Sequence, residues 1–97
     1  MVQKKFNPNV IINCYLKVLE ESVKKDKDNA RANALLGTLY FQQKSYARAQ
    51  KYLLLASRLE PLNFHWYKAL GDLFFDSGDI SEALSYYSKA TELEPKI

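Results

Sequence analysis

The chain has 97 residues, of which 47% are apolar and 26% are charged, and its net charge is +3. These values suit one small globular domain, and the weak charge excludes the strongly basic surface that nucleic acid demands. One cysteine and one histidine cannot form an internal disulfide or a zinc site, and no stretch approaches the roughly 18 uninterrupted apolar residues of a membrane span. We therefore expect a cytoplasmic protein without cofactors that neither inserts into a membrane nor binds nucleic acid.

The first predicted helix begins at Pro8, a residue favoured at the first helical position, behind an N-cap at Asn7. The helix ends in the charged run of residues 24–28. Cys14 lies among apolar residues, so we expect it to be a small buried side chain. The apolar residues that recur at helical spacing are Val10, Ile11, Cys14, Tyr15, Val18, Leu19 and Val23.

Four further helices are predicted, separated by short connections that place neighbouring helices antiparallel. Gly78 suits the left-handed position at a helix end, and Asp79 with Glu82 resembles a capping box. The predicted N-caps of these four helices are Asn29, Ser45, Asn63 and Asp79. Their ends are expected near Gln43, Glu60, Ser77 and Glu94.

The four later helices form two copies of one unit. The shift along the chain that carries Asn29 onto Asn63 also carries the other matching residues of the first copy onto those of the second, without a gap. We call this shift the repeat period. Amphipathicity alone does not explain why small residues, a glycine and a proline recur in one register, so the pattern indicates a duplicated helix-turn-helix unit. The identical pairs are Asn29 and Asn63, Leu36 and Leu70, Gly37 and Gly71, Leu39 and Leu73, Phe41 and Phe75, Ala49 and Ala83, Tyr52 and Tyr86, Ala56 and Ala90, and Leu59-Glu60-Pro61 and Leu93-Glu94-Pro95.

These copies resemble the tetratricopeptide repeat (TPR), whose pattern is W-x2-L-G-x2-Y…A-x3-F…P. The second copy reads Tyr67-x2-Leu70-Gly71-x2-Phe74, then Ala83-x3-Tyr87 and Pro95. The first copy reads Asn33-x2-Leu36-Gly37-x2-Tyr40, then Ala49-x3-Leu53 and Pro61. Asn33 replaces a bulky aromatic residue of the family, and we expect this departure to loosen the contact with the first helix. Residues 8–26 resemble the second helix of an earlier repeat, with packing positions at Ile12, Tyr15, Leu19 and Ser22.

The resemblance implies an all-α fold, a TPR-type right-handed superhelix of antiparallel helix pairs. One contiguous domain is expected, with a degenerate half-repeat at residues 1–29, one repeat at 30–62 and another at 63–97. Such arrays normally need about three units and a polar terminal element, so we expect the last helix to have an uncovered face. Three alternatives stay open for that face: the chain is an excerpt of a longer array, it forms a homodimer, or a partner protein completes the stack. The self-association candidates are Leu84, Tyr86 and Tyr87.

The resemblance also implies a function, because the first helix of each repeat lines a concave surface that binds partner proteins. We predict a non-enzymatic scaffold or adaptor that binds a peptide or helix there; the alternatives are a small secretion-type chaperone that sequesters a partner subunit and an excerpt of a larger TPR assembly protein. Phe41 and Phe75 either point into this groove or pack as core. The candidate partner-binding residues are Arg31, Ala34, Thr38, Phe41, Gln42, His65, Lys68, Asp72, Phe75 and Asp76.

No catalytic constellation is visible in the sequence. His65 has no second histidine or cysteine beside it, and we expect it to be solvated or packed on aromatic rings. The three glycines do not reach the spacing of a phosphate-binding loop. Some family members grip chaperone tails with lysine and asparagine side chains. That mode is disfavoured here, because only Lys68 matches among the corresponding positions Ala34, Thr38, Lys68 and Asp72.

Overall fold

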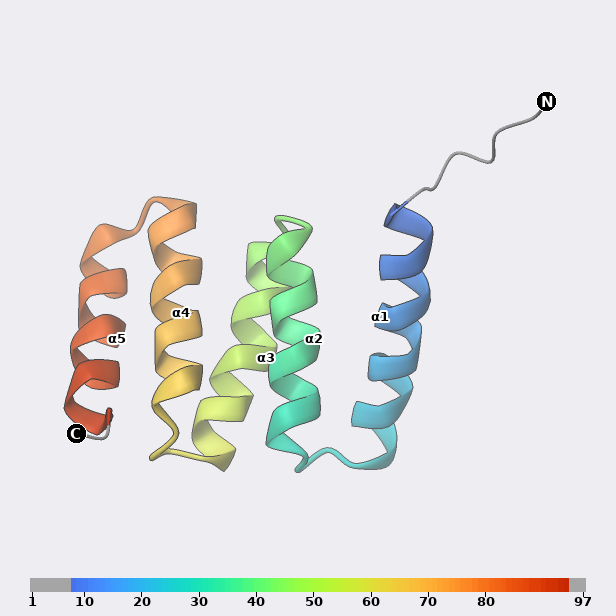
Figure 1. Ribbon diagram of the computed structural model, residues 1–97, viewed down its shortest axis with the longest axis horizontal. Helices are drawn as coiled ribbons and strands as arrows, with labels where there is room; N and C mark the ends of the chain where they lie inside the picture. Colours follow the sequence, from blue (N-terminus) through green and yellow to red (C-terminus); the bar gives the residue numbers. More distant parts are fainter. Residues whose placement is uncertain (1–7, 95–97) are drawn as a thin grey trace.

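The structure is a computed structural model that describes residues 8–94. Within these residues the chain forms helices and no strand. Consecutive helices run antiparallel and stand side by side in a row, with α1 and α5 at opposite ends (Figure 1). The five helices are α1 (Pro8–Lys25), α2 (Ala30–Gln42), α3 (Tyr46–Leu59), α4 (Phe64–Ser77) and α5 (Ile80–Leu93). The prediction of an all-α TPR-type fold is confirmed, whereas the predicted cap at Asn7 and the turn at Pro95 lie outside the described residues.

Local capping chemistry explains where the helices begin. Asn29, Asn63 and Asp79 each accept a hydrogen bond from a first-turn backbone amide, at 3.0, 3.0 and 3.2 Å respectively. Ser45 precedes α3 without such a side-chain bond. Gly78 ends α4 with φ of 97°, a left-handed conformation that costs glycine little because it has no Cβ.

The core lies between the paired helices, α2 against α3 and α4 against α5. A Cβ atom added at Gly37 would lie 2.8 Å from Leu53 Cγ and 3.1 Å from the carbonyl oxygen of Ala49. A Cβ atom at Gly71 would lie 2.6 Å from the ring of Tyr87. Glycine therefore lets the two helices of each pair approach closely enough for leucines to fill the space. The largest fully buried side chains are Leu36, Leu53, Leu70, Leu73 and Asn33.

Asn33 is a buried polar residue at a position where the second unit has Tyr67. Its Nδ2 donates hydrogen bonds to the carbonyl oxygens of Lys27 at 3.1 Å and Asn29 at 2.9 Å. The hydroxyl of Tyr67 donates to the carbonyl of Pro61 at 3.0 Å, and Pro61 lies one repeat period after Lys27. Two different side chains thus satisfy the same carbonyl of the connection. Where a loosened contact was expected, Asn33 ties the α1–α2 connection to α2.

The helix α1 packs on α2 with one face only. Of the four predicted packing positions, Leu19 is buried in the core, Ile12 and Ser22 are partly buried, and Tyr15 is 47% exposed. The expectation for Cys14 is wrong, because its side chain is exposed. Apolar residues on α1 span two faces, and only the face toward α2 has a neighbour among the described residues. Leu16 and Leu19 are the α1 side chains in the core, and Ile12 and Val23 pack against it.

A side-chain hydrogen bond joins α2 to α1. The Tyr40 hydroxyl donates to Glu20 Oε1 at 2.9 Å. Burial, together with the hydrogen bond and negative charge of Glu20, raises the pKa of Tyr40 from 10.0 to about 12. Folding therefore favours the neutral phenol. The contribution of the neutral Tyr40 phenol to folding stability is fully present below the unfolded-state pKa of about 10. It is lost as the pH rises through the native-state pKa of about 12.

We expect Tyr40→Phe to lower the free energy of unfolding at neutral pH by about 1 kcal/mol, because it removes this hydrogen bond and keeps the ring. The variant should also lose less stability than the wild type when the pH is raised from 10 towards 12. Urea denaturation at several pH values measures both effects. Tyr52→Phe is the control, since the Tyr52 ring stacks on Tyr40 at 5.8 Å. Equal losses in the two variants would contradict the assigned role of the Glu20 bond.

Candidate functional site

Two hollows adjoin α2. The first, of about 600 Å³, lies between α2 and the start of α4 and is lined by Arg31, Ala34, Leu35, Thr38, Glu60, Asn63, His65 and Trp66. The second, of about 330 Å³, lies between α1 and α2 and is lined by Tyr15, Leu35, Thr38, Leu39 and Gln42. Leu35 and Thr38 line both hollows, so the two form one groove along α2. We call this surface the α2 groove.

The middle of the α2 groove is apolar. Leu35 is 40% exposed although it is a large aliphatic residue next to the fully buried Leu36. The hydroxyl of Thr38 donates to the carbonyl of Ala34 at 2.9 Å, so its polar group is satisfied within α2. Tyr15 adds an exposed ring from the α1 side. An apolar side chain of a bound segment would therefore meet little competition from unsatisfied polar groups here.

Glu60 holds the indole ring at the α4 side of the groove. Its Oε1 accepts hydrogen bonds from Trp66 Nε1 at 2.9 Å and from Asn63 Nδ2 at 3.0 Å. The bonds from Asn63 and then Trp66 lower the pKa of Glu60. The carboxylate is therefore ionised at neutral pH, and it fixes the orientation of Trp66 beside the hollow.

A cationic side chain and two helix N-termini lie at the same end of the groove as the Glu60 carboxylate. Arg31 and His65 lie in the first turns of α2 and α4, where the helix dipoles are positive. Arg31 is always charged, and no ion pair within residues 8–94 includes it. The His65 ring packs against Phe64 with ring centroids 4.1 Å apart. Arg31 can therefore bind an acidic group of a ligand at this end.

The structure brings only part of the sequence-predicted set to the α2 groove. The predicted residues that line it are Arg31, Ala34, Thr38, Gln42 and His65. Lys68 instead lines a separate hollow of about 210 Å³ between α4 and α5, together with Tyr87. Asp72 accepts a hydrogen bond from the Tyr87 hydroxyl. These two residues therefore belong to the far side of α4.

The remaining predicted residues also lie elsewhere. Asp76 accepts bonds from the Tyr46 hydroxyl at 2.5 Å and from Lys44 Nζ at 3.0 Å, and these bonds lower the pKa of Asp76. Phe41 packs against Tyr46, with ring centroids 6.2 Å apart, as part of the core surroundings. Phe75 is 60% exposed. The two phenylalanines do not form a ring pair in the groove.

Sequence reasoning missed several residues of the α2 groove. Leu35 was the one with a usable signal, because it is a large apolar residue outside the repeat pattern and its counterpart one repeat period later is Ala69. The others come from neighbouring elements, so their arrival depends on packing. The missed lining residues are Tyr15, Leu35, Leu39, Glu60, Asn63 and Trp66.

Among residues 8–94, no three histidine, cysteine, aspartate or glutamate side chains lie close enough together to hold a metal ion. Within the same residues, no helix has the length and apolarity needed to span a bilayer.

Paired antiparallel helices in a regular row, with a groove beside them, define a helical-repeat protein. One model of the tetratricopeptide-repeat family matches residues 16–73 of the chain, and a second matches residues 64–97. The chain therefore belongs to the tetratricopeptide-repeat family.

Solved structures show the same fold. A mutant form of MamA superposes with a TM-score of 0.78 at 21% identity, covering 91% of this chain and 71% of that one. A structure named MamA MSR-1 C2 superposes with a TM-score of 0.75 at 27% identity, covering 88% of this chain. The present chain spans about half of that second protein, 49% of its length. None of the curated proteins matches the chain.

Proposed function

We propose that the chain is a non-catalytic scaffold that holds a segment of a partner protein in the α2 groove. The observation that carries the proposal is the placement of exposed Leu35 where the two hollows meet. An exposed aliphatic side chain in a concave surface gains by burial against a ligand. Membership of a family whose arrays bind proteins through a concave surface supports the same function.

The chemistry of the groove favours a segment with an apolar side chain next to an acidic one. The apolar group would cover Leu35 and the fixed ring of Trp66. The acidic group would lie near Arg31, whose guanidinium can bind a carboxylate through two hydrogen bonds. A groove of this kind gives specificity through a few anchor residues.

The proposal is tested by selecting binders from a displayed library of random peptides against the full chain. We expect the selected peptides to combine aromatic or aliphatic residues with aspartate or glutamate. Their affinity should fall at least about tenfold in Leu35→Asp and in Arg31→Glu, which corresponds to the loss of about 1.4 kcal/mol. Affinity for the wild type should also weaken as salt is added.

Arg58→Glu is the matched control, because Arg58 is an exposed arginine near the end of α3 and does not line the groove. It makes the same change in net charge and should leave peptide affinity within about twofold, in line with the small effect of screened charges outside a contact. Circular dichroism verifies that each variant is folded. Selected peptides that bind Leu35→Asp and Arg31→Glu as tightly as the wild type would refute the groove as the binding site.

A further inference from the structure

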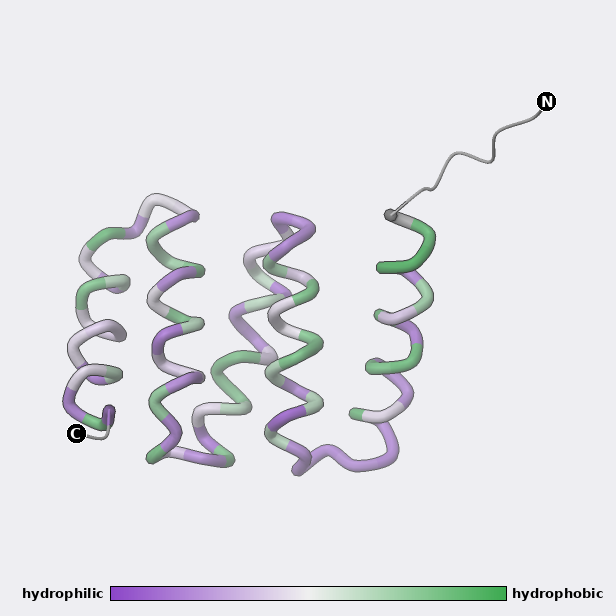
Figure 2. Tube along the Cα trace, viewed as in Figure 1, coloured by the Kyte–Doolittle hydropathy of each residue, from purple (hydrophilic) through white to green (hydrophobic). Residues whose placement is uncertain are grey.

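Exposed apolar side chains gather at the two ends of the row of helices. Nine large apolar residues are exposed among those that the structure describes, and seven of them lie on α1 or at α4 and α5. Figure 2 shows the apolar segment of α1, at the opposite end of the row from α5. The seven residues are Val10, Ile11, Tyr15, Val18, Phe75, Ile80 and Leu84. The surface formed by Val10, Ile11 and Val18 is called the head, and that formed by Phe75, Ile80 and Leu84 is called the tail.

One residue of the head, Val18, occupies a position that forms a helix contact in the complete units. Val18 stands one repeat period before Tyr52 and two repeat periods before Tyr86. The Tyr52 ring stacks on Tyr40 at 5.8 Å, and the Tyr86 ring stacks on Phe74 at 5.4 Å, in each case on the preceding helix. Val18, by contrast, is 62% exposed. Val18 thus occupies a helix-packing position without a partner among the described residues, and Val10 and Ile11 extend the exposed apolar surface beside it.

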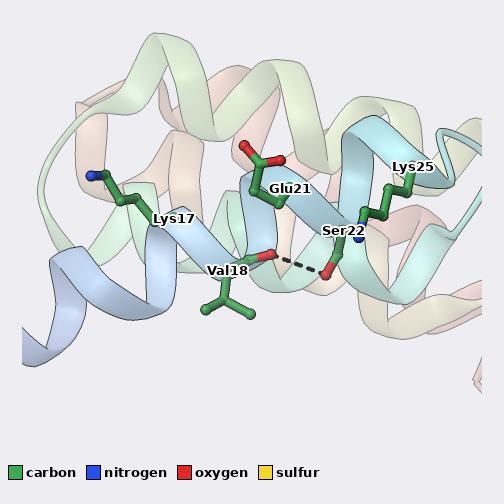
Figure 3. A pocket seen from close by; sticks show the side chains of 5 residues that line it. All are labelled: Lys17, Val18, Glu21, Ser22 and Lys25. Carbon is green, nitrogen blue, oxygen red and sulfur yellow. Dashed lines mark hydrogen bonds between the residues drawn. The ribbon is translucent and has the colours of Figure 1, made fainter.

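A shallow hollow of about 360 Å³ adjoins Val18. In Figure 3, Val18 lies between Lys17 and Lys25 along α1, and the Ser22 hydroxyl donates to the Val18 carbonyl at 3.0 Å. Glu21, which also lines the hollow, contacts Lys24 at 3.6 Å. The head therefore combines an apolar centre with lysines at its margin.

The tail is also an exposed apolar surface, on α4 and α5. Phe75 occupies the same position in the second unit as Phe41 in the first. Phe41 is partly buried against the core, whereas Phe75 is exposed. Leu84, on α5, is 62% exposed. The tail therefore presents apolar side chains on the two helices that would contact a further neighbour.

The two ends carry opposite charge. Within the described residues, 8–25 contain three lysines and two glutamates, and 63–94 contain six acidic residues and two lysines. A head meeting a tail brings unlike charges together, whereas two heads or two tails bring like charges together. Charge thus selects one pairing of the two apolar surfaces.

We propose that this chain associates head to tail with a second copy of itself, so that α1 of one copy packs on the tail of the next. Such a contact is heterologous, and each added copy leaves one free head and one free tail. Assemblies therefore grow with concentration. The contact leaves the α2 groove open, because Arg31 and Leu35 belong to neither surface.

The test uses two variants of the full chain, each blocked at one end. Val18→Asp places a negative charge in the head, and Leu84→Lys places a positive charge in the acidic tail. Both sites are exposed, so both variants should fold, as checked by circular dichroism and thermal melting. Light scattering should show a mass that rises with concentration for the wild type and a monomer for each variant alone.

Mixing the two variants gives the decisive result. Val18→Asp keeps a free tail and Leu84→Lys keeps a free head, so an equimolar mixture should form a dimer containing one of each and grow no further. Leu62→Asp, at an exposed leucine outside both ends, should behave like the wild type. Added salt should weaken the wild-type association.

Three outcomes would overturn the proposal. The wild type could be a monomer at every concentration, which would leave the two ends to a different partner. One variant alone could still form a dimer, which would mean a symmetric contact through a single end. The mixture could stay monomeric although the wild type associates. Each outcome is independent of the peptide-binding experiment, because the blocked residues do not line the α2 groove.

Discussion

Leu53→Ala is expected to lower the free energy of unfolding by about 2 to 5 kcal/mol. Leu53 has no exposed surface, and its Cγ would lie only 2.8 Å from a Cβ atom at Gly37. Because α2 and α3 are already in close contact at this glycine, the pair has little room to collapse around a shortened side chain. The variant should therefore keep a cavity as well as losing buried apolar area. Domains of this size have a total stability of about 5 to 15 kcal/mol, so the loss is large.

Urea denaturation measures this loss, with Leu62→Ala as the control because Leu62 is 78% exposed. The control should change stability by no more than about 0.5 kcal/mol. Trp66 is the only tryptophan and lies in α4, so its fluorescence reports the second unit while circular dichroism reports all helices. Coincident transitions in Leu53→Ala would show that the units unfold together. A loss no larger than that of Leu62→Ala would contradict the assigned core position.

Asn33→Asp is expected to lower the free energy of unfolding at neutral pH by about 3 to 5 kcal/mol, because it buries a carboxylate without a partner. The side chain of Asn33 is fully buried, and its Nδ2 faces the carbonyl oxygens of Lys27 and Asn29. Its Oδ1 has no hydrogen-bond partner within the described part of the chain. In an aspartate, a carboxylate oxygen would replace Nδ2 and face the two backbone carbonyl oxygens, and the charge would lose its solvation by water.

The loss in Asn33→Asp should depend on pH. Burial would raise the native-state pKa of the new carboxyl above its unfolded value of about 3.9, because the neutral acid alone can donate to one of the two carbonyls. The contribution of the protonated carboxyl to folding stability is fully present below the unfolded pKa, and it is lost as the pH rises through the raised native pKa. The difference from the wild type should therefore shrink in acid.

Asn33→Ala is the matched control for this pH dependence. It removes both hydrogen bonds without adding a charge, so it should cost about 1 to 3 kcal/mol at every pH. Denaturation of the three proteins across a range of pH separates the two effects. A difference between Asn33→Asp and the wild type that does not change with pH would mean that the carboxylate reaches water and that the site is not closed.

The features that depend on local chemistry and on repetition could be predicted from the sequence. Asn29, Asn63 and Asp79 can cap helices because their side-chain oxygens reach first-turn amides without help from distant residues. Recurrence of Gly37 and Gly71 at one register indicated close helix pairing, because a repeated small residue has the same steric role in both units. The fold and helix limits follow from these short-range relations.

The neighbour of each apolar face could not be predicted in the same way. The apolar periodicity of α1 predicted a helix, but it did not distinguish Leu19, which is buried, from Val18, which is exposed. Periodicity reports that a face is apolar and gives no information about which helix covers it. For the same reason, Cys14 was expected to be buried, whereas its side chain is exposed.

The sequence by itself determined the repeat, its register and three of the helix caps, because these depend on residues close along the chain or related by one period. Only the tertiary structure decided which side chains meet. Phe41 and Phe75 are identical in type and register, yet Phe41 packs beside Tyr46 and Phe75 lies exposed. Leu35 joins Trp66 in the α2 groove only because α4 lies beside α2. Burial and binding depend on distances between helices, and the space left by the surrounding side chains sets those distances.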